Sequence, residues 1–153
     1  MNAKEDFVVT DAFPTDALSW LMATCSKQLR ESLQQRFTSA GYKVTPDQWA
    51  ILAYLWQQDG LSQQALASRF YRSKVSAFQL INRLEKQGLV FRRADPEDGR
   101  SNLIHLTPKG RSIQSALVAL ARKNMSRALD GISGADLKIA KSVVRKMIRN
   151  TRG

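Results

Sequence analysis

The pattern of this 153-residue chain changes at Gly88, and that change limits the folds open to it. Before Gly88, apolar residues recur every three or four positions, as they do in amphipathic helices. After it, two β-leaning runs, 89–93 and 102–106, enclose a segment of turn residues at 94–101. These runs predict a small antiparallel hairpin with a charged tip. A series of helices that ends in one short hairpin indicates a mainly α fold of the α+β kind.

Three helix starts precede the hairpin at short intervals. The segment 45–48 (TPDQ) has the form of a capping box with proline at the first helical position. Ser62 is placed to cap a short second helix that reaches about residue 70, and Ser73 to cap a third helix over 74–87. Helix, short helix, helix and hairpin is the order of a winged helix-turn-helix core, here residues 45–106.

The segments outside this core, 16–40 and 107–150, are also helical by pattern, and the second is broken near Gly131. Thr15 is placed to cap the first. Both segments carry apolar stripes that a winged-helix core does not need. Because such stripes need cover, we expect a second copy of the chain to supply it, so the two segments form a helical dimerisation region. The chain is expected to be one domain over 1–153.

The charge of the chain is strongly positive. There are 24 Lys and Arg against 13 Asp and Glu, which gives a formal net charge of +11 and a sequence pI of about 10.3. A value this high favours a nucleic-acid partner, although an acidic protein or a membrane surface would also fit. No apolar run approaches a membrane span, and the first residues lack the form of a signal peptide. We therefore expect a cytoplasmic protein.

The residues needed for catalysis or metal binding are scarce. One Cys and one His exclude an internal disulfide framework and leave few ligands for a transition metal. The sequence has no paired carboxylates on one face, no nucleophile–base arrangement and no Gly-rich phosphate loop, so it predicts neither an enzyme nor a cofactor. Cys25 lies on the apolar stripe of the first helix, which favours a packing role. A redox-sensing Cys25 is the alternative.

The third helix has one side suited to base reading. Ideal helical geometry puts Ala77, Leu80, Ile81 and Leu84 on the core side. On the other side, Gln79 can bond adenine in bidentate fashion, and Val75 or Phe78 can meet a thymine methyl group. Arg83, further along the helix, is better placed for phosphates. An ordinary solvated surface helix is the alternative interpretation.

The hairpin tip places the Asp98 carboxylate two residues before Arg100. We expect Asp98 to hold the Arg100 side chain, and Arg100 to enter the minor groove of DNA. Arg92 and Arg93, at the base of the hairpin, are expected to meet the DNA backbone. The alternative is a solvated, charged turn.

The run 61–110 closely resembles the MarR family of bacterial winged-helix regulators. The motifs that carry the resemblance are Leu61-Ser62-Gln63-Gln64, Leu84-Glu85-Lys86, Gly88-Leu89-Val90, Asp95-Pro96, Asp98-Gly99-Arg100 and Leu106-Thr107. The resemblance implies a homodimer with interlocked terminal helices, a recognition helix in the major groove of double-stranded DNA and a wing arginine in the minor groove. It also implies a transcriptional repressor on an inverted repeat, released in many members by a small aromatic or anionic ligand.

The resemblance also adds site residues. Contact positions of the family match Lys74, Ser76, Asp98 and Arg100, and the helix start at Ser62 and Gln63 is expected to meet the DNA backbone. Family members commonly carry Thr-Arg where this chain has Phe78-Gln79. The operator sequence of other members is therefore not assigned to this chain. An effector pocket is expected at Trp20, Trp49 and Tyr54, with plain packing as the alternative. A non-specific architectural DNA-binding protein is the rival function.

Overall fold

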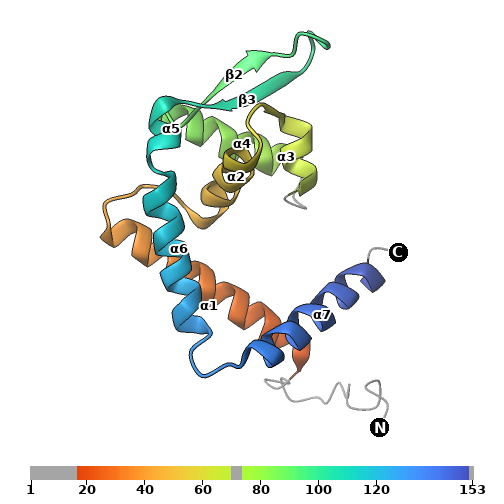
Figure 1. Ribbon diagram of the computed structural model, residues 1–153. Coiled ribbons are helices and arrows are strands. Elements are labelled where there is room, and N and C mark those ends of the chain that lie inside the picture. The colour runs from red at the N-terminus through yellow and green to blue at the C-terminus, as the bar shows by residue number, and fades with distance from the viewer. Residues whose placement is uncertain (1–16, 70–73, 152–153) are drawn as a thin grey trace.

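A computed structural model describes residues 17–69 and 74–151 (Figure 1). In chain order the elements are α1 (Leu18–Ser39), α2 (Pro46–Gln57), β1 (Leu61–Ser62), α3 (Gln63–Arg69), α4 (Lys74–Lys86), β2 (Val90–Ala94), β3 (Asn102–Leu106), α5 (Pro108–Ser112), α6 (Gln114–Ala128) and α7 (Gly134–Thr151). In Figure 1 the strands and α2–α5 gather in the upper half, while α1, α6 and α7 form the lower half. The mainly α fold with a small β wing is therefore confirmed.

Side-chain caps fix where the helices begin. Thr45 and Gln48 form the predicted capping box: the Gln48 amide donates to Thr45 Oγ1 at 3.2 Å, and the Thr45 amide donates to Gln48 Oε1 at 2.9 Å. The Ala65 amide donates to Ser62 Oγ at 3.1 Å, so Ser62 caps α3 as expected. The caps predicted at Thr15 and Ser73 lie outside the described residues.

The sheet has one strand more than the predicted hairpin. β2 and β3 pair antiparallel from Val90–Leu106 to Ala94–Asn102, and β1 pairs with the other edge of β3. β1 is only two residues long, too short for an alternating pattern to reveal it. Gly60, just before β1, has φ +74°, and a Cβ there would lie 2.8 Å from His105 Cε1. Glycine is therefore required where β1 approaches β3.

The helix expected to run from residue 108 to the break near Gly131 is instead two helices. Ile113 separates α5 from α6. Its amide donates to the Arg111 carbonyl, and Ser112 Oγ donates to the Lys109 carbonyl at 2.8 Å. These short-range bonds compete with the α-helical ladder, and they explain the break that the apolar spacing did not show.

One hydrophobic core joins the winged helix to the base of the long helices. Its fully buried members come from α1, α2, α3, α4, β3 and α6 and include Phe37, Leu52, Leu66, Ile81, Ile104 and Leu117. Between α1 and α6 the buried polar residue Asn124, 6% exposed, accepts from Ser32 Oγ at 2.7 Å and from Arg36 Nε at 3.1 Å, and donates to the Leu29 carbonyl at 3.1 Å. These bonds satisfy the buried amide and fasten the two helices together.

The far ends of the long helices keep their apolar stripes exposed. Leu21 on α1 is 43% exposed and Ile139 on α7 is 62% exposed, and no described residue of α7 is buried. Cys25, expected to pack as a small apolar residue, is exposed in the single chain. Among the described residues, no helix is long and apolar enough to cross a membrane.

Candidate nucleic-acid interface

Helix α4 divides into the two sides that its sequence predicts. Ala77, Ile81 and Leu84 are buried, and Leu80 packs against the same core. The opposite side is open: Val75 is 66% exposed and Phe78 46%. Lys74, Gln79 and Arg83 are also exposed, whereas Ser76 is half-buried. The polar and apolar groups suited to base contacts therefore stand on the free side of this helix.

Arg92 ties the wing to α4. Its guanidinium donates to the Glu85 carboxylate and, at 2.6 Å, to Asn82 Oδ1. It also lies over the Phe78 ring, 5.2 Å from the ring centroid. The sequence predicts a phosphate contact for Arg92, but its guanidinium already binds Glu85 and Asn82 of α4. The same guanidinium covers one face of the exposed Phe78 ring. Arg93, the next residue of β2, is exposed.

The wing tip is shaped by two carboxylates that bind the backbone. Asp95 Oδ1 accepts from the Glu97 amide at 2.9 Å, and Asp98 Oδ1 accepts from the Arg100 amide at 3.1 Å. The sequence predicts that the Asp98 carboxylate contacts the Arg100 guanidinium, but the observed contact is with the Arg100 backbone amide. Asp98 instead fixes the backbone from which the Arg100 side chain leaves, so any orienting effect acts through the turn.

Residues of α3, α4 and the wing meet at one depression. Its volume is about 210 Å³, and Gln63 of α3, Lys74 of α4 and Arg100 of the wing tip line it. Gln64, Ser101 and Asn102 complete the lining. The sequence predicts a DNA contact for each of Gln63, Lys74 and Arg100 separately, and the fold brings the three together. The sequence does not predict the other three lining residues, because no pattern in the chain shows which residues border a long-range contact.

The three aromatic residues expected to form an effector pocket do not form one within a single chain. Trp49 is partly buried and packs against the core, with its ring centroid 6.5 Å from that of Phe37. Trp20 lies near the start of α1, about 25 Å along the helix from Phe37 at 1.5 Å per residue. Tyr54 donates to the Arg69 carbonyl at 3.3 Å, beside α3. Packing accounts for the two rings, but Trp49 Nε1 is buried without a hydrogen-bond partner among the described residues.

The arrangement of α2, α3 and α4 with the wing, and the exposed side of α4, define a winged helix-turn-helix protein. A sequence profile of the MarR family matches residues 42–101. An organic hydroperoxide resistance transcriptional regulator from Bacillus subtilis (strain 168) is 30% identical over 105 residues, which are 69% of this chain and 70% of that protein. The chain belongs to the MarR family.

Two further comparisons cover more of the chain. The transcriptional regulator HosA of Escherichia coli O111:H- is 28% identical over 124 residues, which are 79% of this chain and 92% of HosA. The crystal structure of a MepR–DNA complex from S. aureus is similar with a TM-score of 0.79 at 25% identity, covering 91% of this chain and 99% of that one. The protein is a MarR-family transcriptional regulator with a DNA-binding winged helix.

Proposed function

We propose that this protein is a sequence-specific repressor that binds an inverted-repeat operator as a homodimer. The observation that carries the proposal is the meeting of Gln63, Lys74 and Arg100 at one depression, next to the exposed side of α4. A DNA duplex needs a base-reading helix and a set of flanking phosphate contacts on one surface. This face of the winged helix offers both.

Each part of the surface has its own task in this proposal. α4 enters the major groove, where Gln79 bonds a base edge and Val75 meets a thymine methyl group. Lys74 and Gln63 contact phosphates, as does Arg83 further along α4. Arg100 enters the minor groove, whose negative potential is strongest in narrow A·T tracts. The net charge of +11 strengthens binding to any sequence, and it is the base contacts that discriminate.

The homodimer is proposed from the exposed apolar stripes of α1 and α7. Leu21 and Cys25 of α1 and Val144 of α7 border one apolar depression of about 610 Å³. Burying such stripes against a second copy removes apolar area from water, which is a favourable contribution to association. Two-fold symmetry then implies operator half-sites centred about 10 base pairs apart.

The test is selection of bound fragments from genomic DNA by the full chain, followed by footprinting. The proposal expects an inverted repeat protected on both half-sites. It also expects lower expression of a reporter placed downstream of that repeat when the protein is present. Fragments with no shared sequence would instead identify an architectural DNA-binding protein. A single asymmetric footprint would contradict the homodimer, and a rise in reporter expression would contradict the repressor role.

A small aromatic or anionic effector that releases the operator belongs to the same proposal. Trp20, Trp49 and Tyr54 form no common cavity within one chain.

A further inference from the structure

An uncovered apolar pair lies on the free side of α4, in the half of the molecule that carries the wing (Figure 1). Val75 is 66% exposed and Phe78 46%. The two residues are three positions apart, so their side chains are neighbours on the helix surface. At helical spacing the same stripe continues with Asn82 and Glu85. The stripe is therefore apolar near the start of the helix and polar toward its end.

Arg92 of β2 covers the polar end of this stripe and one face of the Phe78 ring. Its guanidinium donates to the Glu85 carboxylate and, at 2.6 Å, to Asn82 Oδ1, and it lies 5.2 Å from the Phe78 ring centroid. Stacking on an aromatic face is a favourable contact for a planar guanidinium. Because Arg92 is itself held at two points, the Phe78 ring is directed before any partner binds.

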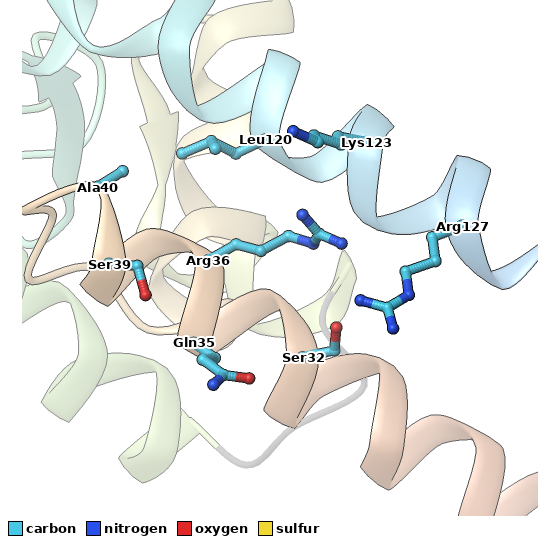
Figure 2. Close-up of a pocket in the computed structure, with 8 residues that line it drawn as sticks. All are labelled: Ser32, Gln35, Arg36, Ser39, Ala40, Leu120, Lys123 and Arg127. Atoms are coloured by element: carbon cyan, nitrogen blue, oxygen red, sulfur yellow. The ribbon is translucent and has the colours of Figure 1, made fainter.

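The charge of Arg92 is compensated, which distinguishes it from other cationic side chains of this protein. Arg127 of α6 extends into the space between α1 and α6, and no Asp or Glu is among the described residues that line that space (Figure 2). Arg92 is instead paired with the Glu85 carboxylate beside Phe78. The exposed part of the Phe78 ring is consequently suited to an apolar group rather than to a phosphate.

Double-stranded DNA offers few apolar groups to such a site. In the major groove the base edges present hydrogen-bond donors and acceptors, and the apolar group among them is the methyl group on C5 of thymine. Lys74 and Arg83, which are exposed on the same helix, suit phosphates. The surroundings of Phe78 therefore match DNA in charge, and the ring itself matches a pyrimidine methyl group.

We propose that Phe78 contacts the methyl group on C5 of a pyrimidine in each operator half-site, and that Arg92 positions the Phe78 ring for this contact. The inference rests on the proposed function, in which Val75 meets one thymine methyl group, and it adds a second methyl contact. Thymine and 5-methylcytosine carry this methyl group on the same ring atom. The site therefore takes either base, and methylation of a cytosine at this position raises the affinity.

The test uses the full chain and its selected operator, with deoxyuridine replacing thymidine at one position of both half-sites at a time. This exchange removes the methyl group and keeps the hydrogen-bonding groups of the base. We expect the affinity to fall about fourfold for each methyl group lost from Phe78, the value of one buried methylene, and about fifteenfold for the symmetric pair. An operator in which no thymine position responds would overturn the inference and leave the proposed function standing. Failure to select any operator would contradict the proposed function, and this inference with it.

Variants decide which side chain contacts the methyl group. Phe78→Ala should bind the thymine and uracil operators equally at one position per half-site, while a position contacted by Val75 keeps its response. Phe91→Ala is the matched control, since Phe91 is 43% exposed on the wing and stacks on His105. The control should leave every thymine-to-uracil ratio unchanged. Thymine-to-uracil ratios that are unchanged in Phe78→Ala as well would overturn the assignment.

Arg92→Gln separates positioning of the ring from a general structural role. At a temperature well below unfolding, this variant should reduce the thymine-to-uracil ratio at the position contacted by Phe78 and keep the ratio at the position contacted by Val75. An equal fall at both positions would show that α4 as a whole has shifted, and would contradict the positioning role of Arg92.

Cytosine methylation tests the chemical class of the site. A cytosine paired with guanine, placed at the position contacted by Phe78, should weaken binding, and methylation of its C5 should raise the affinity again by about fourfold per half-site. Phe78→Ala should show no such gain. Absence of the gain in the unmodified protein would show that the contact is limited to thymine, and would overturn the assignment to 5-methylpyrimidines.

Discussion

Arg92 and Arg93 are neighbours in β2, yet their surroundings differ. Arg92 is turned toward α4, where it contacts Glu85, Asn82 and Phe78, and its side chain is 18% exposed. Arg93 follows on the other face of the strand and is exposed. Replacing each by Gln removes the same charge from almost the same place. The pair therefore separates a residue that holds the wing on α4 from an exposed residue that we propose meets the DNA backbone.

The contacts of Arg92 set the size of the expected effect. Its ion pair with Glu85, whose side chain is 40% exposed, contributes about 0–1 kcal/mol because water screens it. The hydrogen bond to Asn82 adds about 0.5–1.5 kcal/mol, and the stacking on Phe78 about 0.5–1 kcal/mol. Arg92→Gln should therefore lower the free energy of unfolding by about 1–3 kcal/mol, whereas Arg93→Gln should change it by less than about 0.5 kcal/mol.

The assay is urea unfolding at matched chain concentration, combined with operator affinity over a range of salt. Arg93→Gln should make the operator binding constant less dependent on salt. The slope of log K against log salt concentration should decrease in magnitude by about the contribution of one phosphate contact. Arg92→Gln should weaken the complex without that change of slope, because the wing is less firmly placed rather than less charged toward DNA. The opposite result for Arg92→Gln would be an unchanged free energy of unfolding together with a smaller slope of log K against log salt. That result would show that Arg92 itself contacts a phosphate, and it would refute this reasoning.

Four further predictions follow from the same structure. Gln79→Ala should cost about 1–3 kcal/mol of operator binding and relax preference at one base pair per half-site, as binding to a panel of single-base operator variants would show. Leu21→Glu should convert the dimer to a monomer in sedimentation and abolish operator binding with it. Asp98→Ala should weaken operator binding in a titration, because the turn before Arg100 loses the bond from the Arg100 amide to the Asp98 carboxylate. The variant also removes a negative charge from the wing, so tighter binding would contradict this prediction. Gly60→Ala should lower the stability to urea by about 1–3 kcal/mol, while Gly99→Ala, where a new Cβ meets nothing within 4 Å, should change it little.

Local signals in the sequence predicted most of the fold. The capping box of Thr45 and Gln48, the cap at Ser62 and the hairpin over 89–106 are each set by residues close in the chain, so their patterns could be seen without the structure. The two sides of α4 also follow from its period. β1 and the break at Ile113 did not, because each rests on one or two residues whose partners a pattern does not reveal.

The sequence singles out residues of the candidate site by type and motif, but it does not show their partners. Lys74 and Arg100 both line the depression beside the wing, and Gln79 is exposed on α4. The pairing of Arg92 with Glu85 and Asn82 and the backbone bond of Asp98 depend on how β2 and the turn are placed. The bond between Arg36 of α1 and Asn124 of α6 joins residues 88 positions apart, and no local pattern reports such a contact.

Sequence-specific DNA binding is the central claim, and one ratio tests it most directly. The affinity of the full chain for its selected operator is compared with its affinity for a scrambled duplex of equal length and composition, at one fixed salt concentration near the physiological value. We expect the operator to bind tighter than the scrambled duplex by a factor of about 10³ or more. A ratio below about 10 would mean that the positive charge alone holds the DNA, and that the exposed side of α4 reads no sequence.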